Sequence, residues 1–384
     1  MRSKSRTHSH LHSSVYIPKQ GSVVKPKDIL LNITGGSIGR CALVPDDFDV
    51  ANVNQHVMIV RNLISENRFL LHYILVSSYI QSMIMSVQVG VSREGLSAEK
   101  LKRFLIPLPP LEEQKRIVAK IEELMPYVEE YDKAYIEVTE LNKKFPEDMQ
   151  KSILQYAIQG KLVEQREEEG TAEELYQHIQ EEKKRLIEEG KIKKTRALPE
   201  IAEKDIPFDI PESWKWVRLG DLLNKLTDGA HRTPKYTASG VPFISVKDIS
   251  GGEIDFSDTK FISLKEHEEL YKRCNPEKGD ILLTKVGTTG IAVIIDTEQD
   301  FSLFVSVALL KFNTNLIFNK FLLYAIKSPV VQMQARKNTR GVGNKNWVMR
   351  DIADTIIPLP PLEEQKRIVN EIEEMQPYTK QLIK

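Results

Sequence analysis

The stretch IPLPPLEEQKRIV, from Ile106 to Val118, recurs without a change from Ile357 to Val369. Three more pairs of segments repeat in the same order at nearly the same offset: DILLNITGGSIG and DILLTKVGTTG, RFLLHYI and KFLLYAI, and the Gly-Val dipeptides at 90–91 and 341–342. Self-similarity at a fixed offset marks a duplicated structural unit. The chain is therefore predicted to contain two copies of one unit.

Each copy of the repeated stretch predicts the start of a long helix. Proline disfavours helix in the residue before it, so PLPP is extended and the helices begin near Pro110 and Pro361. The first helix is expected to run to Lys144, about 35 residues or roughly 50 Å at 1.5 Å per residue. Phe145-Pro146 then predicts a break, followed by a helical stretch over 150–160.

Both helices carry an apolar seam. Its spacing alternates between four and three residues, as in a heptad repeat, and such a stripe is narrow for a globular face. The seam of the first helix comprises Ile117, Ile121, Leu124, Val128, Tyr131, Tyr135 and Val138, and that of the second comprises Ile368, Ile372, Met375 and Leu382. We expect the two seams to pair with each other. The alternative is that each helix packs on its own domain.

The charge distribution divides the chain further. Lys and Arg total 54 and so do Asp and Glu, but two mildly basic stretches flank an acidic connector. Basic lobes are compatible with a polyanionic partner. The predicted parts are a first domain (1–108), a helix (109–160), a helical and polar linker (161–210), a second domain (211–360) and a final helix (361–384).

Several protein classes are excluded. No apolar run approaches the roughly 20 residues of a membrane span, and the polar N-terminus does not look like a secretory signal. Two cysteines cannot build a disulfide scaffold, which favours a reducing cytosol. We find no Asn-Pro-Pro-Tyr tetrad, Walker A lysine, nucleotide-binding glycine loop or nuclease cluster. The alternating His8, His10 and His12 lack a fixed scaffold for metal.

With these repeats, and with WKWVRLGDL, DGAHRTPKY, GVPFISVKDI and KSILQYAIQGKLV, the chain strongly resembles the specificity subunit of type I restriction–modification systems. The resemblance implies an α+β fold: two repeated mixed α/β target-recognition domains separated by long antiparallel coiled-coil helices. Each domain would read half of a bipartite site in double-stranded DNA.

The resemblance also implies partners. Two modification (methyltransferase) subunits would dock on the helices and restriction subunits would join them, and a second specificity chain is a further candidate. S-adenosylmethionine, ATP and Mg are expected on those partners, with no cofactor or metal in this chain. A cytoplasmic location without a membrane partner is expected.

The first copy departs from the family pattern. It lacks counterparts of PESWKWVRLGDLL and DGAHRTPKY, so its domain is expected to be truncated at the N-terminus. Missing strands would expose a sheet edge and part of a core.

Base edges are read by amide, hydroxyl and basic side chains, and phosphates by basic and hydroxyl groups. In the second domain the candidates lie in three segments. If they do not contact DNA, QARKNTRGVGNKNW is a solvated turn, DGAHRTPKY a surface turn and KVGTTG a hairpin turn. For KVGTTG the hairpin turn is the favoured interpretation. The candidates are Arg336, Lys337, Arg340, Asn344, Lys345 and Asn346 in QARKNTRGVGNKNW; His231, Arg232, Thr233, Lys235 and Tyr236 in DGAHRTPKY; and Lys285, Thr288 and Thr289 in KVGTTG.

In the first domain the candidates are Arg40, Asn54, Gln55 and Arg93, with His56 beside them. Capping of a strand end is an equal alternative for 54–56.

Two functions follow from these features. The first is a non-catalytic DNA-recognition subunit that directs adenine methylation and restriction by partner subunits. The alternative is a coiled-coil assembly or decoy subunit that binds modification subunits without recognising DNA. A single-chain methyltransferase-nuclease is disfavoured by the missing motifs.

Overall fold

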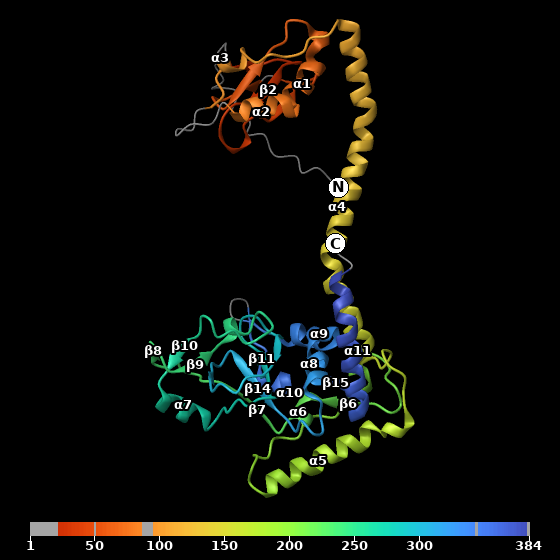
Figure 1. Cartoon of the computed structure of the whole chain (residues 1–384), viewed down its shortest axis with the longest axis vertical. Coiled ribbons are helices and arrows are strands. Elements are labelled where there is room, and N and C mark those ends of the chain that lie inside the picture. The colour runs from red at the N-terminus through yellow and green to blue at the C-terminus, as the bar shows by residue number, and fades with distance from the viewer. Residues whose placement is uncertain (1–21, 50, 87–94, 342–344, 382–384) are drawn as a thin grey trace. The chain divides into compact units, whose positions relative to one another are not determined.

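The computed structural model describes residues 22–49, 51–86, 95–341 and 345–381. The chain forms two compact units, Met1–Glu137 and Val138–Lys384, and each has a hydrophobic core of its own. Both units mix helices with strands (Figure 1). The predicted class of repeated mixed α/β domains with long helices is confirmed.

The first unit is built on a small antiparallel sheet. Its strand order is β3 (Cys41–Leu43), β2 (Ile29–Asn32), β5 (Val57–Val60), beside a short ladder of β1 (Val23–Val24) and β4 (Ala51–Asn52). Ile29 and Leu31 alternate with half-buried neighbours along β2 and point to one face. There they meet Leu75, Ile80 and Ile84 of the helices α1 (Arg68–Val76) and α2 (Ser78–Ser86). A short helix, α3 (Ala98–Leu101), follows.

The second unit contains two four-stranded sheets and one two-stranded ladder. The first sheet has the order β12 (Ala292–Ile294), β11 (Ile281–Thr284), β14 (Val307–Lys311), β7 (Lys225–Asp228). The second has the order β13 (Ser302–Leu303), β9 (Val241–Ile244), β10 (Lys260–Ile262), β8 (Tyr236–Thr237). The ladder joins β15 (Ile356–Leu359) to β6 (Lys215–Arg218).

Helices cover these sheets (Figure 1). They are α5 (Ala172–Glu188), α6 (Leu219–Leu222), α7 (Leu264–Tyr271), α8 (Asn319–Lys327), α9 (Pro329–Asn338), α10 (Met349–Ala353) and α11 (Leu362–Gln381). The predicted capping box at Thr171 starts α5. The largest core gathers the apolar faces of β11, β14, β15, α5 and α8, so this unit folds around one main core.

The duplication recurs in individual hydrogen bonds. The Gln81 side-chain amide donates to the carbonyls of Gly39 and Leu75 at 2.9 and 2.7 Å. Gln332, 251 positions later, donates to Gly290 and Ile326 at 2.8 and 2.9 Å. Gly39 and Gly290 both have positive φ, at 83° and 90°, and a Cβ on either would collide with its glutamine. The two copies therefore share one local design.

The copies differ at one edge of the sheet. In the second unit β14 lies between β11 and β7, and its residues Val307, Ala308, Leu309 and Leu310 are fully buried. Among the described residues, no strand covers the matching side of β5, which is only half-buried. Within the described residues, the two sheets therefore differ at the position that β7 occupies in the second unit.

The first long helix extends further than expected. α4 (Leu111–Ile158) is a single 48-residue helix, so the predicted break at Phe145-Pro146 is wrong. Its last turns carry Ile153, Leu154 and Ala157, which are buried in the second unit. This packing stabilises the helix beyond Pro146, since tertiary contacts outweigh local propensity.

The second seam packs elsewhere than predicted. Ile368 and Ile372 of α11 are buried against the last turns of α4 and against Phe321 and Ala325 of α8, with Met375 beside them. α11 runs antiparallel to this end of α4 (Figure 1). The described residues therefore follow the alternative: α11 packs within its own unit, which includes the last turns of α4, and not on the first seam.

The first seam is largely exposed. Its residues beyond Ile121 are at least 46% exposed, and Tyr131 and Tyr135 stack on each other at 6.2 Å. They comprise Leu124, Val128, Tyr131, Tyr135 and Val138. Ile117 and Ile121 are half-buried and line a groove of the first unit. Leu382 lies outside the described residues.

In the described part of the chain, no single helix is long and apolar enough to cross a membrane. The bent pair α1 and α2 has the length and composition of a membrane span when the two helices are taken together. However, its Leu75, Ile80 and Ile84 lie in the core of the first unit. Both cysteines are free thiols, and burial raises the pKa of Cys274 to about 12.

Candidate nucleic-acid interface

A buried carboxylate organises one edge of the second unit. Asp228 ends β7 and is 5% exposed. Its oxygens pair with Lys285 Nζ at 3.2 Å, with His231 Nε2 at 3.0 Å and with the guanidinium of Arg273. Burial raises the pKa of Asp228, but hydrogen bonds from His231 and Lys285 outweigh it and hold the pKa below its usual range. Asp228 thus joins DGAHRTPKY to KVGTTG.

The side chain of Lys285, one of the candidate DNA contacts, is buried. Its side chain is 6% exposed and faces Asp228, because a buried ammonium needs a carboxylate partner. Its backbone N–H donates to Ser306 at 2.9 Å, and its carbonyl accepts from Trp347 N–H at 2.8 Å. Lys285 therefore holds the segments together rather than reaching a ligand.

The segment QARKNTRGVGNKNW joins the same edge. Arg340 and Asn346 form a two-way backbone bridge at 3.0 and 2.9 Å, and Gly287 N–H donates to the Lys345 carbonyl at 2.9 Å. Trp347, fully buried, anchors the end of the loop in the main core. The three candidate segments of the second domain thus meet at one place. Asn344 lies outside the described residues.

Most of the candidate side chains on these segments are accessible. The exposed ones are His231, Arg232, Thr233, Lys235, Tyr236, Thr288, Arg336, Lys337, Arg340 and Lys345. Arg340 is 72% exposed in its side chain and lies 3.8 Å from Asp351. Thr289 is half-buried and contacts the Thr339 hydroxyl at 3.3 Å. Asn346 is also half-buried, since its backbone forms the bridge, so it is a poorer candidate for base contact.

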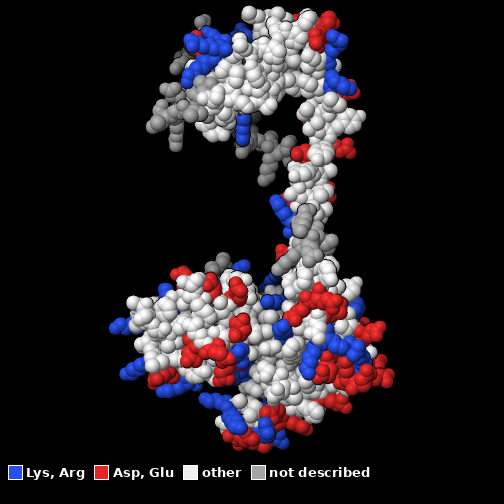
Figure 2. All heavy atoms as spheres, in the orientation of Figure 1, with Lys and Arg blue, Asp and Glu red and all other residues white. Residues whose placement is uncertain are grey.

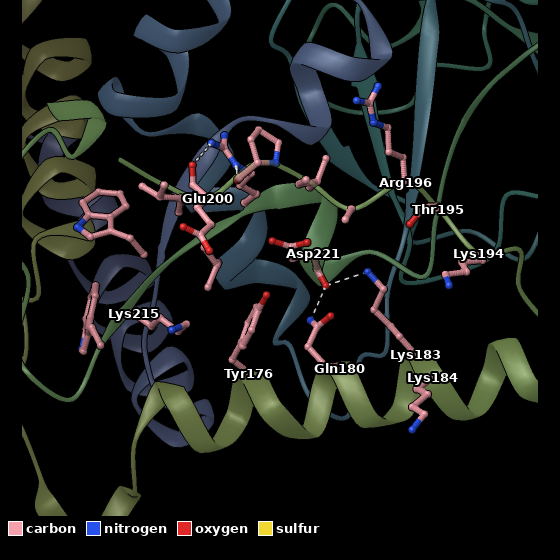
Figure 3. A pocket seen from close by; sticks show the side chains of 18 of the residues that line it. Tyr176, Gln180, Lys183, Lys184, Lys194, Thr195, Arg196, Glu200, Lys215 and Asp221 are labelled. Atoms are coloured by element: carbon pink, nitrogen blue, oxygen red, sulfur yellow. Dashed lines mark hydrogen bonds between the residues drawn. The ribbon is translucent and has the colours of Figure 1, made fainter. Parts of the chain in front are cut away.

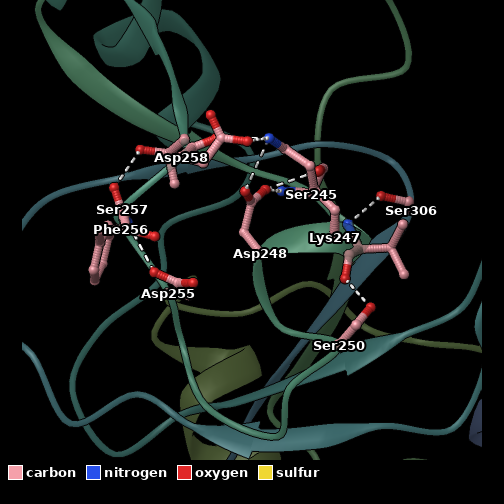
Figure 4. A network of polar contacts seen from close by, with 11 residues as sticks. Ser245, Lys247, Asp248, Ser250, Asp255, Phe256, Ser257, Asp258 and Ser306 are labelled. Atoms are coloured by element: carbon pink, nitrogen blue, oxygen red, sulfur yellow. Dashed lines mark hydrogen bonds and ion pairs between the residues drawn. The ribbon is translucent and has the colours of Figure 1, made fainter. Parts of the chain in front are cut away.

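A polar network lies next to the same edge and includes Ser306 (Figure 4). Asp248 accepts from the Ser245 N–H at 2.7 Å and from its hydroxyl at 2.8 Å, and Val246 N–H donates to the Ser306 hydroxyl at 3.1 Å. The Ser306 carbonyl in turn accepts from Lys285 N–H. The segment GVPFISVKDI therefore fixes the base of the candidate surface.

Two basic residues of this region were not among the candidates predicted from the sequence. The Lys260 ammonium lies 4.3 Å from the centre of the Tyr236 ring, and Arg273 completes the cluster around Asp228. Arg273 lies 45 residues from Asp228, so no local motif could have linked them. Lys260 sits on β10, opposite β8 in the sheet, and only the strand register brings it to Tyr236.

In the first unit, two candidate segments also come together. The Thr34 hydroxyl lies 2.6 Å from His56 Nδ1, and Ile33 N–H donates to the His56 carbonyl at 2.9 Å. Asn54 accepts from His56 N–H at 3.0 Å, which is the capping alternative for that residue. Arg40 and Gln55 are exposed. Arg93 lies outside the described residues.

Charge on the second unit is mixed. On the face shown in Figure 2, basic and acidic side chains are interspersed rather than gathered into one basic field. Among the described residues, no group of three His, Cys, Asp or Glu side chains could hold a metal ion. The candidate surface therefore depends on the placement of individual side chains.

A separate cavity of about 1220 Å³ lies under the linker (Figure 3). Lys183 donates to the carbonyls of Gly220 and Asp221, and burial lowers the pKa of Lys183 and raises that of Asp221. Arg218 donates to the carbonyls of Pro199 and Glu200. These contacts fasten the linker to the second unit.

The sequence matches the model of the type I restriction modification DNA specificity domain over residues 5–153 and 211–384. The chain belongs to this family. The two matched regions correspond to the two repeated copies, so the predicted duplication coincides with two specificity domains. The resemblance inferred from the repeated motifs is thereby confirmed.

Curated relatives carry the same assignment. The chain is 26% identical over 312 residues to the EcoAI specificity subunit of Escherichia coli, covering 70% of this chain and 53% of that protein. It is 27% identical over 292 residues to the EcoBI specificity subunit of the same species, covering 75% and 55%. The chain thus spans just over half the length of these relatives. Both are named specificity subunits of type I restriction enzymes.

A solved structure supports the fold. A chain from work on complex assembly and conformational transition of the type I R-M system matches with a TM-score of 0.52 at 21% identity, covering 94% of this chain and 77% of that one. At this identity the likeness concerns the fold of the specificity-domain family alone.

Proposed function

We propose that this chain is the sequence-specific DNA-recognition subunit of a type I restriction–modification complex. It directs adenine methylation and restriction, both carried out by partner subunits, at a bipartite site in double-stranded DNA. The proposal rests on membership of the specificity-domain family and on the surface described above.

One observation carries the proposal. Three segments of the second domain, separated by about 50 to 110 positions in sequence, meet around Asp228, Lys285 and the Arg340–Asn346 bridge. The buried groups hold the backbone, and the exposed Arg232, Lys235, Arg340 and Lys345 project from it. Readout requires such a division between rigid support and accessible basic side chains, because phosphate contacts position a protein and base contacts specify the sequence.

Arg340 is the strongest candidate for reading a base. It is next to Gly341, whose φ of 110° is a backbone conformation that favours glycine. The guanidinium of Arg340 is mostly exposed. Arginine makes bidentate hydrogen bonds to guanine in the major groove. Arg336, Lys337 and Lys345 are suited to phosphates, which attract basic side chains irrespective of sequence.

The partner subunits would dock on α4. Its exposed seam includes Tyr131 at 70% and Val128 at 55% exposure, and the face of α4 seen in Figure 2 is mostly uncharged. Exposed apolar surface of this kind marks protein contacts. Two modification subunits and the restriction subunits are the proposed partners, and they would hold S-adenosylmethionine, ATP and Mg. The complex would act in the cytoplasm.

The open edge of β5 favours a second candidate function. A first domain without an outer strand would leave its half-site unread, and the chain would act as an assembly or decoy subunit for modification subunits. The two functions differ in one measurement. When it is purified with its modification subunits, a recognition subunit binds specific DNA in preference to random DNA in a competition assay. A decoy subunit also co-purifies with the modification subunits but shows no sequence preference.

A further inference from the structure

Two identical stretches of this chain have different surroundings. In 357–369 the side chains of Glu364, Ile368 and Val369 are 1% exposed. Their counterparts Glu113, Ile117 and Val118, within 106–118, are exposed or half-buried. Because the sequences are the same, the difference lies in what covers them.

Three elements cover the second copy. The strand β6 pairs antiparallel with β15, from Ile356 opposite Arg218 to Leu359 opposite Lys215. The Trp214 indole N–H donates to Glu364 Oε2 at 2.9 Å. Arg367 pairs with both carboxylate oxygens of Glu169 at 2.8 and 2.7 Å. The end of α4 packs on the apolar face of α11.

Among the residues that the structure describes, nothing covers the same groups of the first copy in this way. Residues 105–108, the counterpart of β15, form no strand, and Leu105 and Leu108 are 80% and 69% exposed. Within the described residues, the side chains of Glu113 and Arg116, both in α4, make no hydrogen bond or ion pair. A groove of about 650 Å³ runs beside them, lined by Leu70, Tyr73, Ile74, Leu105, Ile106 and Ile117 among others.

We propose that this groove is the docking site of a second polypeptide. That polypeptide supplies in trans an apolar helix end, a glutamate and a tryptophan-led β-strand, built as residues 153–218 are built in this chain. The strand adds to 105–108 by β-augmentation. The complementary groups are in place: Glu113 accepts the indole N–H and Arg116 receives the carboxylate.

A separate polypeptide fits better than a second copy of this chain. In every molecule of this chain, the second unit already buries Ile153, Leu154, Ala157 and Trp214. If these side chains were offered to another molecule, that core would open and its apolar groups would be exposed to water. The proposal does not depend on DNA reading, since it concerns only the completion of the first unit.

The test uses the full chain and a fluorophore-labelled synthetic peptide, PESWKWVRLGDLL, which is its own Pro211–Leu223. In the second unit this segment is in place, so the peptide meets only the first unit's groove. We expect saturable binding at one peptide per chain in fluorescence anisotropy, with slowed hydrogen exchange at 105–108. Ile106→Asp weakens binding by about tenfold or more, because a carboxylate is then buried against apolar groups. Leu63→Asp, at a fully exposed site outside the groove, leaves it unchanged.

A double-mutant cycle tests the polar contact. Glu113→Ala weakens binding of the unmodified peptide but not of the peptide with Trp214→Phe, which lacks the indole N–H. Absence of saturable binding, or equal binding by Ile106→Asp, overturns the proposal. So does self-association of the chain that is lost in Ile106→Asp and competed by the peptide, because the occupant is then a second copy.

Discussion

Lys285 Nζ lies 3.2 Å from Asp228 Oδ2, and both side chains are 6% exposed. This ion pair joins two segments that are 57 positions apart, and the loop around Gly341 closes on them through Asn346. The candidate recognition surface is therefore held by buried charge, while its exposed side chains remain available to a ligand.

Asp228→Asn removes the carboxylate from this arrangement. Lys285 would then be buried without a counter-charge, so we expect a loss of about 3–5 kcal/mol in unfolding free energy. Urea unfolding measures it. A second substitution, Lys285→Met, should recover part of the loss because the uncompensated charge is gone. Equal stability of Asp228→Asn and the unmodified chain would contradict the role assigned to the pair.

The same carboxylate predicts an acid dependence. The pKa of Asp228 is lowered in the folded chain from 3.8, so its ionised form stabilises the fold above that value. This contribution is lost as pH falls through the lower folded pKa. The stability difference between the unmodified chain and Asp228→Asn should therefore be constant at neutral pH and shrink below about pH 4. A difference that grows on acidification would contradict the assignment.

Arg340→Ala tests base reading. We expect specific binding to weaken by about 1–3 kcal/mol, with relaxed preference at one position of the site. Lys345→Ala should weaken binding to all sequences alike and lower the salt slope by about 1. Both are compared with Arg185→Ala, an exposed arginine of α5 outside the surface. Unchanged affinity and preference in Arg340→Ala would remove Arg340 from the interface.

The repeated stretch offers a matched pair of core mutations. Ile368 is buried and Ile117, in the identical sequence, is half-buried. The three tryptophans, Trp214, Trp216 and Trp347, all lie in the second unit, so their fluorescence reports on that unit alone. Ile368→Ala should lower the fluorescence-detected unfolding free energy by about 2–5 kcal/mol. Ile117→Ala should leave this transition unchanged, and equal effects would contradict the difference in packing.

Much of the fold could be predicted from the internal repeat and from the proline-rich stretches that precede the helices. The PLPP stretches locate the starts of α4 and α11 within two residues. The passage of α4 through Pro146 could not be predicted. It depends on Ile153 and Leu154 packing with Trp214, Phe321 and Ile368, which lie 60 to 215 positions further along the chain.

The candidate site was predicted only in part. Exposed basic loops such as that of Arg340 follow from composition and glycine, which are local. The burial of Lys285 follows from Asp228 on another strand, and Arg273 joins through the fold alone. Local sequence shows which side chains are available, whereas tertiary pairing determines which of them remain free to bind.

The most direct test of DNA recognition is a genome-wide map of methyladenine, read by single-molecule sequencing after co-expression of this chain with its cognate modification subunit. We predict methylation within a defined bipartite motif, one half of which changes or is lost in Arg340→Ala. A complex that co-purifies intact but methylates no defined motif would contradict the proposed recognition function and leave the decoy function in its place.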